Sequence, residues 1–319
     1  MKRALVVAVG TALALQACAA PYDGDGEVSF TAGQPVRPVS ATATSVVVDT
    51  DLGGDDLAAL AFLLRHPNVS VEAITVAGGG LVGCDPGVDI VADLLTALGE
   101  PAVPVACGPA PGEGMEFPDE WRELAETGTG IPRAASTLEP EADGAAALIA
   151  RLARQHDDLV LVALGPMTTA ADLVESEPKA AGRLAGIHAM GGSVEGVPVD
   201  GVAEWNAAAD PTAFRTVLAA GVPLTVVPED AVPTGTPDVL SGAAPVVGRV
   251  AATVSYPAWW DLATAAALVA ADGTVLETGE WVLDDEVPGR LFRTGEGDVQ
   301  VVRSLDEQEL DSAYAEAFG

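Results

Sequence analysis

Apolar runs separated by acidic or glycine-rich turns recur along the chain, and the first of them sets the pattern. Residues 46–48 are β-branched, which is typical of a buried strand, and residues 57–64 are apolar nearly all round and rich in helix formers. Pro67 should end this helix. Between them lies Asp49-Thr50-Asp51-Leu52-Gly53-Gly54-Asp55-Asp56, where the two glycines allow a tight turn. The pattern predicts a strand, a turn and a buried helix, with four aspartates at the carboxyl end of the strand.

Strand and helix patterns alternate through the rest of the chain. Further strands are expected at residues 70–77, 104–108, 159–163, 187–192 and 222–227, and helices at 88–98 and 145–155. Residues 109–137 predict a long loop without regular structure, which acts either as a lid or as a surface loop pinned by Met115, Phe117 and Trp121. Residues 281–319 predict a hairpin and a final helix. Residues 45–319, about 275 in number, fit one large α/β domain.

The four clustered aspartates point to a bound cation. Carboxylates held together at one strand end repel each other, and a hard metal ion is the simplest compensation. Ca²⁺ is preferred to Mg²⁺ if several protein oxygens bind directly. The alternative is a solvated acidic turn that caps the helix. Capping explains one or two of these residues, but not Asp49 and Asp51 at alternate positions on the strand end. Open α/β sheets place ligands at this edge.

The spacing of the aspartates separates two known families. Haloacid-dehalogenase-type phosphotransferases also carry Asp-x-Asp after a strand, but Gly-Thr or Gly-Val is expected directly after the second aspartate, where this chain has Leu52-Gly53-Gly54. The run from Asp49 to Asp56 instead resembles the Asp-Thr-Asp-x-Gly-x-Asp-Asp signature of the inosine-uridine-preferring nucleoside hydrolases. The resemblance implies a doubly wound, mostly parallel sheet flanked by helices, with a Rossmann-like core.

Four later blocks continue the resemblance in register up to residue 271. They are Thr75 to Gly79, Leu164 to Thr169, Met190-Gly191-Gly192 with Ala203-Glu204-Trp205-Asn206, and Trp260-Asp261 with the alanines that follow. The implied activity is calcium-dependent hydrolysis of the N-glycosidic bond of ribonucleosides, which releases base and ribose. The implied enzyme is a hydrolase acting on small N-glycosyl compounds.

The resemblance also assigns roles to individual residues. Ca²⁺ would be bound by Asp51, Asp56, the Leu164 carbonyl and Asp261, and Asp51 would take a proton from water held by the metal. Asp49 would support the cluster from below. The substrate would be bound by Asp55, Glu204, Asn206 and Asp261, which suit sugar hydroxyls, together with Met190, Trp260 and Gly79.

Two positions depart from the family pattern. Gly79 stands where the family has an asparagine that contacts the sugar, and Trp260 stands where part of the family has a histidine that protonates the leaving base. An indole cannot act as a general acid, although it can stack on a heterocycle. The base would then leave in one of three ways: Trp260 and Trp121 stack on it, a water molecule protonates it, or the substrate has an easier leaving group. A protein of another class, a catalytically weak surface nucleoside- or sugar-binding lipoprotein that retains the metal site, is the alternative.

The N-terminus predicts export. Residues 1–18 combine a charged start, an apolar segment too short to span a bilayer, and Leu15-Gln16-Ala17-Cys18, which looks like a bacterial lipobox. Cleavage before Cys18 would place a lipid on its sulfur and anchor the protein in the cell membrane, whereas ordinary cleavage near Ala20 would release it. Residues 19–44 are rich in Pro, Gly, Ser, Thr and Asp and predict a flexible linker.

The net charge limits which partners the protein can bind. The chain carries 15 basic and 47 acidic residues, for a formal charge of −32. Nucleic-acid binding is excluded on this balance, because little basic surface exists to neutralise phosphates, and neutral substrates suit the surface better than anionic ones.

Cys84 and Cys107 would form a disulfide in an oxidising compartment, or remain two separate buried thiols. The resemblance also implies a homo-oligomer, since the family often forms dimers or tetramers.

Overall fold

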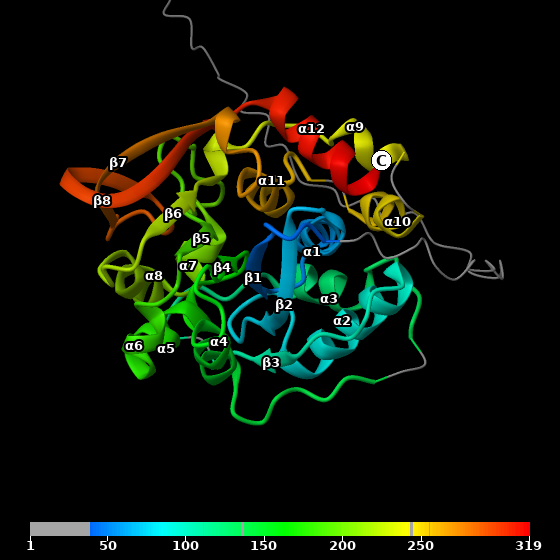
Figure 1. Ribbon diagram of the computed structural model, residues 1–319. Coiled ribbons are helices and arrows are strands. Elements are labelled where there is room, and N and C mark those ends of the chain that lie inside the picture. The colour runs from blue at the N-terminus through cyan, green and yellow to red at the C-terminus, as the bar shows by residue number, and fades with distance from the viewer. Residues whose placement is uncertain (1–38, 111, 135–136, 243–244, 255) are drawn as a thin grey trace, which may run out of the picture.

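The protein folds around one eight-stranded sheet. In the computed structural model, residues 39–319 are described except for 111, 135–136, 243–244 and 255. The strands lie in the order β3-β2-β1-β4-β5-β6-β8-β7 (Figure 1). Every neighbouring pair is parallel except the β7–β8 hairpin. This confirms the predicted doubly wound, mostly parallel sheet. The predicted signal peptide with Cys18, and the linker up to residue 38, lie outside the described residues.

The strands match the expected apolar runs to within a few residues at most positions. They are β1 (Thr44–Thr50), β2 (Val69–Val76), β3 (Val105–Cys107), β4 (Val160–Ala163), β5 (Gly186–Met190), β6 (Leu224–Val227), β7 (Thr274–Leu283) and β8 (Leu291–Leu305). The hairpin begins at Thr274, well before the expected start at Trp281, because residues 274–280 pair with β8 although most of them are exposed. β1 begins at Thr44, one residue inside the expected linker.

Helices cover both faces of the sheet. Those on one face are α1 (Gly54–Arg65), α2 (Cys84–Leu98), α10 (Pro245–Thr253), α11 (Trp260–Ala267) and α12 (Glu307–Phe318). Those on the other face are α4 (Ala145–Ala153), α5 (Thr168–Ser176), α6 (Pro178–Ala181) and α8 (Pro211–Leu218). The remaining α-helices are α3 (Asp119–Thr127), α7 (Trp205–Ala209) and α9 (Asp238–Gly242), with 3₁₀ turns η1 (Glu229–Ala231) and η2 (Ala271–Gly273).

The two helical layers explain the apolar runs. Val46 and Val48 of β1 pack into the core beneath α1 and α11, whereas Val47 packs into the core beneath α4 and α5. A strand covered on both faces must be apolar at every position, as in parallel α/β sheets generally. Within the described residues, no helix is both long and apolar enough to cross a bilayer.

Two local expectations change. Residues 109–137 are not without regular structure, because α3 forms within them. Helix α2 starts at Cys84 rather than at residue 88, and Cys84 is joined to Cys107 at the end of β3 by a disulfide with a Cα–Cα distance of 5.6 Å. Of the two alternatives for these cysteines, the structure has the disulfide. It ties the start of α2 to the end of β3.

Candidate active site

The candidate site lies at the carboxyl ends of β1 and β4, where the strand order reverses. Strands β2 and β3 continue from β1 in one direction, and β4, β5 and β6 continue in the other. Crossover connections leave β1 and β4 toward opposite faces of such a sheet, so a crevice opens between them. Asp49 and Asp51 lie at this end of β1, and Leu164 follows β4 directly.

The turn after β1 is backbone-constrained. Leu52 is completely buried and has φ of 65°, a left-handed conformation that is uncommon for a side chain of its kind. This turn directs Asp51 inward and lets α1 begin at Gly54, so that Asp55 and Asp56 fall in the first helical turn. A strained residue held beside a cluster of charges is typical of functional sites.

Asp56 is the most firmly held of the aspartates. Its Oδ1 accepts hydrogen bonds from the Thr50 hydroxyl at 2.6 Å and from the Asp51 backbone N–H at 3.2 Å. Its Oδ2 accepts from the Gly53 N–H at 3.1 Å. Three donors fix the direction of this carboxylate before any ligand arrives, which is the preorganisation that a metal or sugar site requires.

Asp261 joins the cluster from the far end of the chain. It lies in the first turn of α11, and its backbone N–H donates to Asp55 Oδ2 at 3.3 Å. Carboxylate oxygens of Asp55, Asp56 and Asp261 all lie within 4.8 Å of one another. The side chains predicted to gather from both ends of the sequence therefore do so, and Asp55 belongs to the closest group although it was assigned to the sugar alone.

No described basic side chain compensates the negative charge of this buried cluster. Burial first, and then the charge of Asp56, raises the pKa of Asp51 well above its usual value and that of Asp55 to about 7. Burial also raises the pKa of Asp261, followed by the charges of Asp56 and Asp55. No ion pair joins these carboxylates, or Asp49, to a described Arg, Lys or His residue.

One oxygen of the cluster has no hydrogen-bond partner. Asp261 Oδ1 is buried and accepts nothing from the described residues. A buried, unpartnered carboxylate oxygen is costly unless a cation or a ligand hydroxyl reaches it. Hard oxygen donors in this number suit Ca²⁺ or Mg²⁺. The residues present therefore fit a divalent metal ion.

Asp49 lies beneath the cluster, as expected. It is completely buried, and its Oδ1 accepts a 2.6 Å hydrogen bond from the Thr75 hydroxyl on β2. Burial raises its pKa to about 7, although the Thr75 hydrogen bond acts in the opposite direction. The contact joins the ends of β1 and β2 under the carboxylate cluster.

Leu164 and Asn206 meet on the other side of Asp51. The Asn206 side-chain amide donates to the Leu164 carbonyl at 2.6 Å and lies 3.3 Å from the Met190 sulfur. A Cβ added to Gly165 would lie 2.9 Å from the Asp51 Cβ, so the turn after β4 packs directly on Asp51. The predicted metal-binding carbonyl is therefore beside the cluster, but its partner in this structure is the asparagine assigned to the sugar.

Glu204, which is predicted to bind the sugar, also holds the backbone around it in place. Its carboxylate accepts from the N–H groups of Asn206 and Ala207 at the start of α7, and from Gly192 at 2.6 Å. Burial raises the pKa of Glu204, and these backbone donors act against the shift. The carboxylate thereby fixes Asn206 and the glycine turn after β5 in one unit at the rim of the site.

The positions of the two family departures lie on opposite sides of the cluster. Gly79 belongs to the loop after β2, whose Leu81 N–H donates to Asp51 Oδ2 at 3.1 Å. Trp260 is half-buried at the start of α11, whereas Trp259 beside it is part of the core. Trp260 packs against the core with part of its surface and remains partly exposed next to Asp261.

Tyr256 is a site residue that sequence reasoning missed. Its hydroxyl accepts from the Gly54 N–H at 3.2 Å, and its ring centroid lies 6.1 Å from that of Trp260. It belongs to no motif, and the only sequence signal is its position before Pro257, shortly ahead of Asp261. Its contact with the first residue of α1 links the segment before α11 to the acidic turn.

The segment 109–137 covers helix α7. Phe117 stacks on Trp205 at 5.6 Å between ring centroids, and Trp121 of α3 meets the same indole edge-on at 5.2 Å. The Met115 N–H donates to the Ala208 carbonyl at 2.9 Å. Because Trp205 lies between Glu204 and Asn206, the segment is packed on the element that carries the expected sugar-binding residues.

A doubly wound sheet with a buried carboxylate cluster at its switch point, flanked by amide and carboxylate groups suited to a polyol, agrees with the family that the sequence motifs resemble. Residues 46–310 match the family described as inosine-uridine preferring nucleoside hydrolase. The match covers most of the chain, which therefore belongs to this family.

Individual relatives support the assignment. The chain is 32% identical over 186 residues to the pyrimidine-specific ribonucleoside hydrolase RihA of Enterobacter sp. (strain 638), a match that covers 57% of this chain and 58% of the relative. The aligned part thus spans little more than half of that enzyme. The RihA of Shewanella sp. (strain ANA-3) is also 32% identical, over 185 residues, with 57% of each chain covered.

Solved structures share the fold. The inosine-uridine preferring nucleoside hydrolase from Bacillus anthracis superposes with a TM-score of 0.73 at 23% identity, covering 86% of this chain and 98% of that one. The purine-preferring ribonucleoside hydrolase from Gardnerella vaginalis gives a TM-score of 0.73 at 20% identity, covering 86% and 97%.

Proposed function

We propose that this protein hydrolyses the N-glycosidic bond of ribonucleosides and that it depends on Ca²⁺. The observation that carries the proposal is the convergence of Asp55, Asp56 and Asp261 on one buried point at the sheet edge, with Asp261 Oδ1 unpartnered and with the Asp51 backbone hydrogen-bonded to Asp56. Family membership supports the reaction class. One relative named above is pyrimidine-specific and another is purine-preferring, so the preferred base has to be determined by experiment.

The metal would be held by Asp51, Asp56, Asp261 and the Leu164 carbonyl, with Asp55 near enough to contribute. Bound Ca²⁺ would polarise water and anchor the ribose hydroxyls. The Leu164 carbonyl accepts from the Asn206 amide in this structure, and its second lone pair can bind a metal at the same time. A metal bound to this carbonyl would therefore lie close to Asn206.

The side chains divide the remaining work. Asp51, whose pKa is raised by burial, is suited to accept a proton from the attacking water. Asp55, Glu204 and Asn206 would hold sugar hydroxyls and fix the ring. Positive charge builds on the sugar as the glycosidic bond opens, and the surrounding carboxylates stabilise it in a site with little water.

Departure of the base requires a different solution from that of histidine-containing relatives. Trp260 and Tyr256 provide aromatic surface at the start of α11, and aromatic rings stack on heterocycles. Stacking holds the base but supplies no proton, so water would protonate it. Substrates with good leaving groups should therefore react disproportionately fast.

A substrate panel tests the proposal. Inosine, uridine and p-nitrophenyl riboside are incubated with the full chain, and ribose release is measured with Ca²⁺, with Mg²⁺ and with EDTA. Release that EDTA stops and Ca²⁺ restores is expected, with p-nitrophenyl riboside the fastest. Asp56→Ala should abolish release, while Asp93→Asn, which alters a buried carboxylate of α2 outside the cluster, should leave it near the wild-type rate.

The same panel separates the alternative function. A surface binding protein that retains the metal site would bind nucleosides or ribose saturably in a calcium-dependent manner and release no sugar. Two residues favour this binding function. The Glu204 carboxylate already accepts several backbone hydrogen bonds, and Trp260 cannot donate a proton to the leaving base. Turnover by Asp56→Ala at the wild-type rate would contradict both functions.

We further propose export and lipid attachment at Cys18, supported by the lipobox-like sequence alone. In bacteria that process lipoproteins, the mature chain should carry acyl groups by mass spectrometry and fractionate with membranes. Cys18→Ser should release it, and a soluble, unmodified wild-type chain would contradict the anchor.

A further inference from the structure

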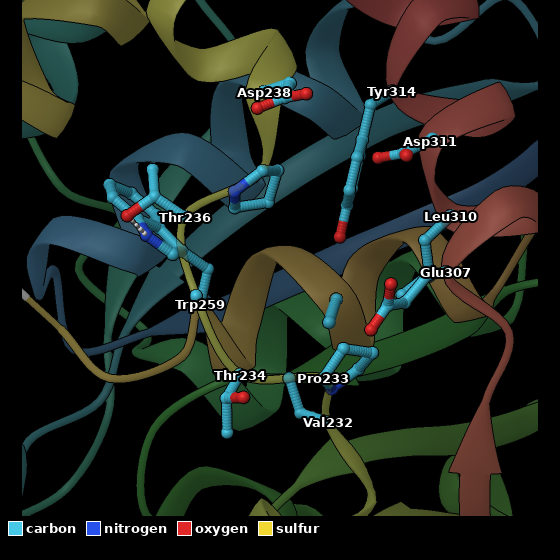
Figure 2. Close-up of a pocket in the computed structure, with 13 residues that line it drawn as sticks. Val232, Pro233, Thr234, Thr236, Asp238, Trp259, Glu307, Leu310, Asp311 and Tyr314 are labelled. Atoms are coloured by element: carbon cyan, nitrogen blue, oxygen red, sulfur yellow. Dashed lines mark hydrogen bonds between the residues drawn. The ribbon is translucent and has the colours of Figure 1, made fainter.

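A second hollow lies apart from the acidic site. It has a volume of about 240 Å³ and opens between the segment 232–238, the start of α11 and the C-terminal helix α12 (Figure 2). None of the five clustered aspartates lines it. Nothing in the proposed reaction uses this hollow, which we call the α12 pocket.

The α12 pocket has an apolar floor and a polar mouth. Val232, Trp259, Leu310 and Tyr314 line the floor and are buried. The mouth is exposed and is lined by hydroxyl and carboxylate side chains, namely Thr234, Thr236, Asp238, Glu307 and Asp311. A concave apolar surface with a few converging polar groups is the usual form of a small-molecule site.

Tyr314 contributes a polar group to the floor. Its side chain is 2% exposed and lines the pocket. Figure 2 shows the ring descending from α12 with the hydroxyl directed toward the middle of the pocket. A ligand in the pocket can therefore reach this hydroxyl.

The charge of the lining selects the ligand. Glu307 and Asp311 stand at the mouth with no basic residue lining the pocket, so anions are repelled. The floor offers the aromatic side chains of Trp259 and Tyr314, and ammonium groups bind to aromatic faces between carboxylates. The volume is small compared with drug-sized sites. We propose that the α12 pocket binds a small organic ammonium ion.

The pocket is connected to the start of α11. The Trp259 indole N–H donates to the Thr236 hydroxyl at 3.3 Å, and the Gly235 N–H donates to the Pro257 carbonyl at 2.7 Å. Thr234 also forms a β-bridge with Ala258. An occupant of the pocket therefore contacts the residue that directly precedes Trp260, and the Trp259 indole N–H is a natural reporter of binding.

Choline and its neutral isostere 3,3-dimethyl-1-butanol test the charge requirement. Each is titrated into calcium-loaded, ¹⁵N-labelled full chain, and the indole N–H signals of the five tryptophans are followed, with Trp259→Phe assigning the reporter. Choline should shift the Trp259 signal saturably in the millimolar range, about tenfold or more tightly than the alcohol. No saturable shift, or equal affinity for the two compounds, would overturn the proposal.

Matched variants locate the site. Glu307→Gln should weaken choline binding severalfold, whereas Glu309→Gln, which removes the same charge from the same first turn of α12 but does not line the pocket, should leave it unchanged. Tyr314→Phe should weaken it as well. Asp261→Asn should retain binding, since the catalytic cluster is not involved. Equal effects of Glu307→Gln and Glu309→Gln, or loss of binding in Asp261→Asn, would refute the assignment.

Discussion

Replacing Asp261 by asparagine should stabilise the calcium-free protein and reduce the further stabilisation that calcium provides. The carboxylate oxygens of Asp55, Asp56 and Asp261 lie within 4.8 Å of each other and have no cationic partner among the described residues. Two full negative charges at that distance repel by about 3.5 kcal/mol at an effective dielectric constant of 20. Asp261→Asn removes the repulsion that Asp261 exerts on both neighbours while keeping the volume of the side chain.

The size of the effect follows from two opposing contributions. Partial protonation already relieves some of the repulsion in the metal-free protein, so a gain of about 2 kcal/mol is expected there, or roughly 4 to 8 °C in Tm. Calcium at 100 times its Kd stabilises the wild type by about 2.7 kcal/mol. Loss of one charged ligand should weaken calcium binding at least about tenfold, which removes about 1.4 kcal/mol of that stabilisation.

Thermal unfolding of chelated protein, followed by stepwise addition of Ca²⁺, measures both contributions. The expected pattern is a higher Tm for Asp261→Asn in EDTA and a much smaller rise when calcium is added. Asp93→Asn is the control, since Asp93 is a buried carboxylate of α2 that accepts from the Ala134 N–H and pairs with Arg133. It should lose stability and keep the full calcium response. A wild-type calcium response in Asp261→Asn would refute the metal assignment.

Three further changes probe other parts of the molecule. Burial and then the charge of Glu204 raise the pKa of Glu229 from 4.5 to about 7, so ionisation of Glu229 lowers the stability of the fold as the pH rises from 4.5 to 7. Glu229→Gln should therefore raise the free energy of unfolding by about 1 to 2 kcal/mol at pH 8, after a discount for partial exposure. It should change nothing near pH 4.5, and thermal unfolding at the two pH values measures both. Reduction of the Cys84–Cys107 disulfide should cost about 3 kcal/mol, measured by denaturant unfolding with and without reductant, and an unchanged midpoint would contradict it. Gly54→Ala should weaken calcium binding in calorimetric titrations without removing a ligand, because its Cβ would lie 2.7 Å from Val254; Gly83→Ala, whose Cβ meets nothing within 4 Å, should not.

The parts predicted best from sequence are those in which local chemistry and fold agree. The turn after β1 carries its own glycines, and the apolar runs around it are long enough to specify a strand and a helix. A strand buried on both faces has no alternation to misread, so β1 and β4 appear almost where expected. The cluster itself was predictable because four aspartates this close are hard to explain without a cation.

Helix α3 was missed for a physical reason. None of its residues is buried, and its apolar face is short, because only Trp121, Leu124 and Ala125 recur at helical spacing within a segment rich in Gly and Pro. The available signal was the proline before its first residue and the acids Asp119 and Glu120 in its first turn, which favour a helix N-terminus. Its position depends on Trp121 meeting Trp205, and a contact between residues so far apart cannot be read from local pattern.

The hydrogen bond between Asn206 and the Leu164 carbonyl was equally inaccessible. Both residues were recognised separately, one as a sugar ligand and the other as a metal ligand. Their pairing arises because the contacts of Glu204 with Gly192 and with its own helix hold α7 against the turn after β5, the strand next to β4. Sequence reasoning assigned roles one residue at a time, whereas the structure shows these two residues in contact with each other.

The acidic cluster exists because helices α1 and α11 pack against each other, and this separates two kinds of change in the site. The contact brings Asp261 to Asp55 and is buried among apolar residues of both helices, such as Leu60 and Leu262. Gly79 lies outside this core, and Trp260 is only partly buried where it packs against it. Substitutions at these two positions should therefore change the border of the cluster more than the positions of the carboxylates that α1 and α11 bring together.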